Sequence, residues 1–172
     1  MLHLKSSFFI ILLSSLVLLG CYTEPTFIEF DAEGFNREWA AWEAQRLVNY
    51  SVDEDFHLPT GFGNVRIVVQ NNVIIQKEAL DEWTSPEHVS DALKTISEIY
   101  VWVNSQYERA LERIEAGELK GITIKLTYNK EFHYPEYVSL DWEGWEQSGM
   151  LGSATPTYIY LSVFTPESIP EE

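Results

Sequence analysis

An apolar side chain recurs every three or four residues through the centre of this chain, and this stripe constrains the fold more than any other feature. The stripe consists of Val89, Leu93, Ile96, Tyr100, Val103, Tyr107, Leu111 and Ile114. Such spacing over about seven turns predicts one amphipathic helix with a buried face. Ser85-Pro86-Glu87 suits its start and Gly117 its end. A sheet is the expected cover for the stripe, and a partner helix is the alternative.

A shorter helix is predicted over Phe35–Val48. The spacing of Phe35, Trp39 and Trp42 puts all three on one face of that helix. We interpret the two tryptophans as core residues that pack against a sheet. A platform for carbohydrate or another ligand is the alternative.

Other segments have the two-residue period of β-strands. Apolar and polar residues alternate from Tyr50 to Leu58, and Glu54 is the one residue that breaks the pattern. Asn71-Asn72 suits a two-residue hairpin turn, because asparagine tolerates positive φ. Six strands are expected, over residues 50–58, 65–70, 73–77, 122–128, 137–142 and 158–164.

The element order α-β-β-β-α-β-β-β predicts an α+β fold. Because most links between strands are short, we expect a single antiparallel sheet of about six strands with both helices on one face. Glu131–Pro135 echoes Asp55–Pro59 with three identities in five residues, which suggests two duplicated halves. In that arrangement His57 and His133 would approach each other at one end of the sheet.

The N-terminus has the layout of an export signal. Lys5 precedes the uncharged run Phe8–Leu19, and Gly20-Cys21 follows it. The run is shorter than the roughly 20 apolar residues that a transmembrane helix needs. We therefore expect residues 1–20 to be a signal peptide, residues 21–30 a lipidated tether, and residues 31–172 a single globular domain.

Leu18–Cys21 resembles the lipobox of bacterial lipoproteins, in which the cysteine is acylated and becomes the first residue after cleavage. Cys21 is the only cysteine of the chain, so no internal disulfide can use it. The resemblance implies a protein anchored by lipid at Cys21 to a bacterial membrane, on the periplasmic or outer-membrane face. An ordinary cleaved signal and an uncleaved anchor are the alternatives.

The formal net charge is −16 at pH 7. Such a charge argues against nucleic acid as a partner, because phosphate binding needs clustered lysine and arginine. Anionic lipid headgroups would also repel the domain, so the lipid at Cys21 has to provide the membrane attachment. The surplus of acids either attracts a basic partner or divalent cations, or serves solubility alone.

A wider resemblance is to a family of uncharacterised bacterial secreted or lipid-anchored domains of unknown function. The residues that carry it are Trp39, Asn49-Tyr50, the Asn71-Asn72 hairpin, the long helix, Tyr128, Tyr134-Pro135 and Asp141. It covers about residues 35–165. This chain has Asn129 where the family has an acid, which weakens any ligand role at that position. The resemblance implies export and a fold, and no known activity.

No segment carries a catalytic or cofactor motif, and we predict no catalytic residue, cofactor or metal. The histidines lack the spacing of a metal pair. The tight acid clusters are Asp53-Glu54-Asp55 and Asp141-Trp142-Glu143. A carboxylate-dependent hydrolase using Asp141 and Glu143, and weak calcium binding, remain alternative functions.

The main functional prediction rests on aromatic residues near the C-terminus. Those predicted to contribute to binding, together with one acid, are Tyr137, Asp141, Trp142, Trp145, Tyr158 and Tyr160. A sheet with helices on one face leaves a second face open, and aromatic side chains are favoured in binding patches. We expect a non-enzymatic envelope module that binds a protein or polymer through that face and the loop 143–156. Core filling by the same aromatics is the alternative.

Overall fold

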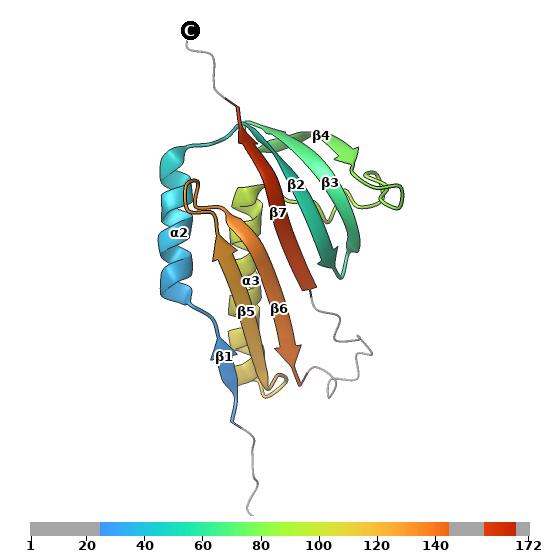
Figure 1. Cartoon of the computed structure of the whole chain (residues 1–172). Helices are drawn as coiled ribbons and strands as arrows, with labels where there is room; N and C mark the ends of the chain where they lie inside the picture. The colour runs from blue at the N-terminus through green and yellow to red at the C-terminus, as the bar shows by residue number, and fades with distance from the viewer. Residues whose placement is uncertain (1–24, 145–156, 168–172) are drawn as a thin grey trace, which may run out of the picture.

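The computed structural model describes residues 25–144 and 157–167, and these residues form an α+β domain (Figure 1). Its helices are α2 (Ala32–Gln45) and α3 (Ile96–Glu115). Its strands are β1 (Phe27–Glu29), β2 (Tyr50–Leu58), β3 (Gly61–Gln70), β4 (Val73–Ala79), β5 (Gly121–Tyr128), β6 (Pro135–Glu143) and β7 (Thr157–Pro166). Each of the six predicted strands is present, with ends that differ by a few residues.

All seven strands belong to one sheet in the order β1-β5-β6-β7-β2-β3-β4. β1 runs parallel to β5, and the other neighbours are antiparallel. The sheet is therefore mixed, whereas we predicted an antiparallel sheet of about six strands. β1 lies in the segment expected to be tether, and three residues without alternation gave no strand signal. Its pairing depends on a partner strand more than 90 residues away in the chain.

The two halves of the chain do not repeat one another in space. β2 and β5, which open the two three-strand units, run in opposite directions because three antiparallel pairings separate them. A shift along the sheet therefore cannot superpose the units. The echoed residues also differ in structure: 55–58 belong to β2, while 131–134 lie in the β5–β6 connection. The predicted duplication is wrong.

Both helices lie on one side of the sheet, as predicted (Figure 1). Trp39 of α2 stacks on Tyr100 of α3 with ring centroids 5.7 Å apart and planes 8° from parallel. Trp42 is buried and meets Tyr50 of β2 edge to face. The prediction that the two tryptophans pack in the core is thus confirmed.

Helix α3 begins ten residues later than the sequence suggested. Thr95 is its N-cap, and Thr95 and Glu98 form a reciprocal capping box. Residues 86–92 form turns and residues 93–95 connect them to the helix; Val89 and Leu93 in this stretch are still buried in the core. The apolar stripe is therefore real, but its first part is contributed by turns. Both Ser85 and Thr95 are residues that can cap a helix. The capping box at Thr95 satisfies more of the free backbone N–H groups than Ser85 can.

Candidate functional site

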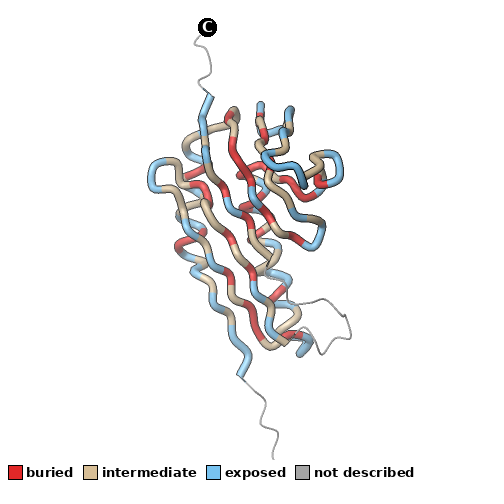
Figure 2. Tube along the Cα trace, turned by 45° about the vertical axis from the view of Figure 1, so that its right-hand side comes forward, coloured by how far each residue is buried: buried red, intermediate tan, exposed pale blue. Residues whose placement is uncertain are grey.

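Side chains of the central strands alternate between the helix side and the opposite side of the sheet. In β2, Tyr50, Val52, Phe56 and Leu58 are buried toward the helices. Figure 2 shows the same alternation as red and lighter segments along the strands. No described element crosses the side away from the helices (Figure 1). We call this side the open face; its central residues are Asp55, His57, Phe62, Tyr137, Ser139, Tyr158 and Tyr160.

The register of β6 and β7 brings the predicted tyrosines together on the open face. Tyr137 lies directly opposite Tyr160, and Ser139 lies opposite Tyr158. Tyr160 keeps 47% of its surface exposed. Directly opposed residues on one sheet face have Cβ atoms about 5 Å apart. Three of the aromatic residues proposed from the sequence therefore form one continuous patch.

A row of three rings extends this patch across the neighbouring strands. Tyr158, His57 and Phe62 come from β7, β2 and β3 and occupy one register line. Their ring centroids are 5.9 Å apart for His57 and Tyr158, and 6.1 Å apart for His57 and Phe62. Phe62 is 66% exposed. The row ends in an apolar ring that contributes little to the core.

The acid cluster of β2 is split between the two sides of the sheet. Asp53 and Asp55 face away from the helices, whereas Glu54 is buried beneath the sheet. Arg66 of β3 donates two hydrogen bonds to the Asp53 carboxylate, at 2.6 and 2.8 Å. Asp55 is exposed, and no hydrogen bond or ion pair joins its carboxylate to another described residue. Partial burial, followed by repulsion from Asp81, raises the pKa of Asp55.

The turn after β4 adds an aromatic side chain beside β3. The Asp81 carboxylate accepts hydrogen bonds from the backbone N–H groups of Trp83 and Thr84, at 2.9 and 2.7 Å. Thr84 in turn accepts one from the backbone of Asn64, two residues after Phe62. Trp83 is 82% exposed, the highest value among the large apolar residues described. The turn therefore holds the backbone of Trp83 at the edge of the sheet and leaves its indole exposed.

Three other residues proposed for binding do not join the patch. Trp142 lies opposite Ile122 on the helix side and packs partly buried against the core, so it does not contribute to the open face. Asp141 is exposed on the open side at the end of β6, opposite Thr123. Trp145, like the lipidation candidate Cys21, lies outside the described residues.

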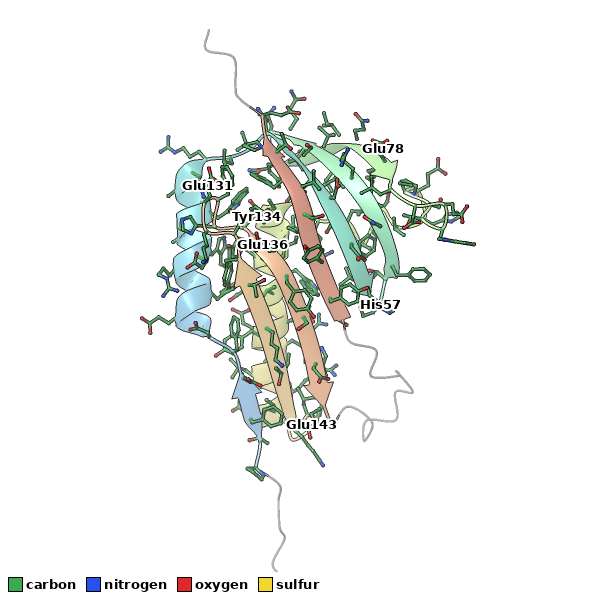
Figure 3. All side chains as sticks on the ribbon, in the orientation of Figure 1. His57, Glu78, Glu131, Tyr134, Glu136 and Glu143 are labelled. Atoms are coloured by element: carbon green, nitrogen blue, oxygen red, sulfur yellow. The ribbon has the colours of Figure 1, made fainter. Side chains whose placement is uncertain are left out.

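The two histidines of the echoed segments lie at opposite ends of the sheet. His57 lies near the end of β2, while His133 lies in the β5–β6 connection, next to the labelled Tyr134 (Figure 3). The His133 ring lies 2.8 Å from the Glu38 carboxylate, and this contact lowers the pKa of Glu38. Tyr100 donates a hydrogen bond to the His133 carbonyl. His133 therefore fastens a loop to α2 and α3, and the predicted approach of the two histidines does not occur.

The acidic alternatives gain no support from geometry. Asp141 and Glu143 are exposed at the end of β6, and the rest of the loop they begin lies outside the described residues. Among the described residues, no group of three or more histidine, cysteine or acidic side chains could hold a metal ion. No helix in the described part of the chain is long and apolar enough to cross a membrane.

Sequence reasoning did not single out Asp55 as an unpaired acid of the site, or the exposed Trp83 at the edge of the sheet. The signal for Trp83 was a tryptophan within the polar stretch Asp81–Ser85, where no strand or helix pattern could bury it. The register between β2 and β3 places Arg66 opposite Asp53, so Arg66 pairs with Asp53 and not with Asp55. Neither strand spacing nor composition shows that choice.

The fold and the site define an α+β domain that displays aromatic and acidic side chains on one uncovered side of its sheet. Comparison with protein-family models, curated proteins and solved structures finds no match to the chain. The resemblance to secreted domains of unknown function thus stays a prediction.

Proposed function

We propose that this protein is a lipid-anchored envelope module that binds another macromolecule through the open face, without catalysing a reaction. The observation that carries the proposal is the adjacency of Tyr137, Tyr158, Tyr160, His57 and Phe62 on a side of the sheet that no described element covers. Aromatic residues with little conformational freedom dominate binding patches. Here they project from paired strands, which hold them in place before a partner arrives.

The dimensions of the sheet agree with a protein-sized contact. Four neighbouring strands, β6, β7, β2 and β3, at about 4.8 Å spacing and about eight residues at 3.3 Å each give a surface of roughly 20 by 25 Å. That is on the order of 500 Å² on one partner, which is less than the about 800 Å² of a standard interface and corresponds to a weak or transient contact. A partner that also contacts Trp83 would enlarge it.

Cross-linked pull-down from a bacterial envelope with the lipidated full chain tests the proposal. Tyr160→Ala removes an exposed ring from the open face, and Val101→Ala removes an exposed apolar side chain from α3. We expect Tyr160→Ala to lose partners that the wild type and Val101→Ala both retain. Equal recovery by all three proteins would overturn the role of the open face.

The anchor is tested separately. We expect radiolabelled palmitate to enter the wild type and not Cys21→Ser, and the variant to leave the membrane fraction. Equal labelling of both proteins would remove the proposed anchor, while leaving the binding surface untouched. The experiment therefore separates where the protein resides from what it binds.

A further inference from the structure

We infer that the occupant of the open face is an extended, cationic segment of a partner protein, with an arginine or lysine side chain seated over Asp55 between aromatic rings. The inference rests on the proposed function and adds the chemistry of the partner. It is carried by one unpaired carboxylate and by the rings around it.

Asp55 has the surroundings of a cation site. Tyr160 lies opposite it on β7 and Asn64 opposite it on β3, and His57 is the next residue on the same side of β2. Its other same-side neighbour, Asp53, already holds Arg66. Within the described part of the chain, a cation that arrives at Asp55 therefore competes with no existing ion pair.

The rings beside Asp55 favour the same ligand. A guanidinium or ammonium group gains from the face of an aromatic ring as well as from a carboxylate, and arginine stacks on rings more readily than lysine. The pKa of Tyr158 is raised first by burial and second by the negative charge of Asp55. The Asp55 carboxylate therefore acts on the tyrosines of the open face. Asp81 adds a second negative field from the turn after β4. A cation would relieve the repulsion between these two carboxylates.

The net charge of the whole chain also favours a cationic ligand. The chain carries a net charge of −16, which attracts cationic partners and repels anionic ones. Arg66, one of the cations on the open side, is taken up by Asp53. An extended segment suits a flat sheet, because its alternate side chains reach the surface at the two-residue period of a strand. Neutral saccharides could stack on the rings but would leave Asp55 unpaired.

The test uses the full chain and a fluorescein-labelled peptide of alternating arginine and serine, with a glutamate–serine peptide as control probe. Fluorescence anisotropy is measured for the wild type, Asp55→Asn and Glu112→Gln. Both substitutions remove one exposed carboxylate, on the open face and on α3 respectively. Thermal melts confirm that all three proteins are folded.

We expect the arginine–serine peptide to bind the wild type and Glu112→Gln equally, and Asp55→Asn at least tenfold more weakly. Binding should weaken with salt, and the glutamate–serine peptide should not bind. Equal loss in the two variants would mean diffuse attraction by net charge and would overturn the inference. So would Asp55→Asn binding within twofold of the wild type.

The pull-down separates this inference from the function on which it rests. If Tyr160→Ala loses the envelope partners while Asp55→Asn retains them, the open face binds, but its ligand is not cationic. If both variants retain every partner, the proposed function and this inference fail together. Loss of the same partner by both variants supports both.

Discussion

Glu54 makes the stability of this domain depend on pH in a direction opposite to that of most acids. It is fully buried, and its Oε1 atom has no hydrogen-bond partner among the residues that the structure describes. The Lys94 backbone N–H donates a long hydrogen bond of 3.5 Å to Oε2. Burial raises the pKa of Glu54 from 4.5 to about 8, and this hydrogen bond and the Lys94 charge offset only part of the effect. The carboxyl group is therefore protonated in the folded protein at pH 7.

The sign of the effect depends on whether the folded or the unfolded chain loses the Glu54 proton at the lower pH. Below pH 4.5, Glu54 is neutral in both the folded and the unfolded chain, and its full contribution to stability is present. As pH rises toward 8, the unfolded chain ionises while the folded one does not, so stability falls. Each pH unit in that window costs about 1.4 kcal/mol. Between pH 5 and 7 the loss is therefore about 3 kcal/mol, a large part of the 5–15 kcal/mol typical of a domain.

Urea unfolding of the wild type and Glu54→Gln at pH 5, 6, 7 and 8 measures this loss. The glutamine amide has nearly the same shape and does not ionise, so its free energy of unfolding should lack this component. We expect the difference between the two proteins to grow by about 3 kcal/mol in favour of Glu54→Gln from pH 5 to 7. Glu112→Gln, which removes an exposed carboxylate from α3, serves as the control.

A difference between wild type and Glu54→Gln that stays constant within about 0.5 kcal/mol from pH 5 to 8 would refute the reasoning. It would mean that the folded protein ionises Glu54 as readily as the unfolded chain does. Water would then have to reach the carboxylate, or the Lys94 ammonium would have to pair with it. Nitrogen-15 relaxation at residues 94–98 would show whether the start of α3 opens.

Three further predictions concern local structure. Thr95→Ala should lower the free energy of unfolding by about 1 kcal/mol in urea titrations, because it removes the capping box. Ser85→Ala should change the free energy of unfolding by less than about 0.5 kcal/mol. If Ser85→Ala were the more destabilising of the two, the helix would start at Ser85. Tyr100→Phe should cost about 1 kcal/mol by losing the bond to the His133 carbonyl, and unchanged stability would show that water replaces the bond. Asn72→Ala should destabilise by about 1 kcal/mol at its φ of 60°, and Asn72→Gly should be tolerated; equal melting temperatures would contradict this.

Local pattern was sufficient to predict the strands and their two sides. The alternation from Tyr50 to Leu58 predicted β2 with its observed ends, and Glu54, which broke the pattern, lies on the buried side where that pattern puts it. The Asn71-Asn72 turn has both residues at positive φ, as predicted. Because side chains alternate strictly along a strand, faces can be read from sequence once a strand is recognised.

Relations between distant segments could not be read in this way. β7 inserts between β6 and β2, and so brings Tyr160 beside Asp55 and Tyr158 beside His57. No local signal states which strands become neighbours. The tyrosines were therefore predictable as members of a face, while the unpaired carboxylate among them was not.

Under the proposed acylation of Cys21, strand β1 would limit how far the domain can stand from a membrane. Only residues 22–26 lie between Cys21 and β1, so the six residue steps from Cys21 to Phe27 span at most about 20 Å. β1 lies alongside the beginning of β5, so an acylated Cys21 would hold that end of the sheet close to the bilayer (Figure 1). The strands would then point away from the lipid with their tyrosines turned sideways. A ligand would meet the protein by moving along the membrane surface rather than descending onto it.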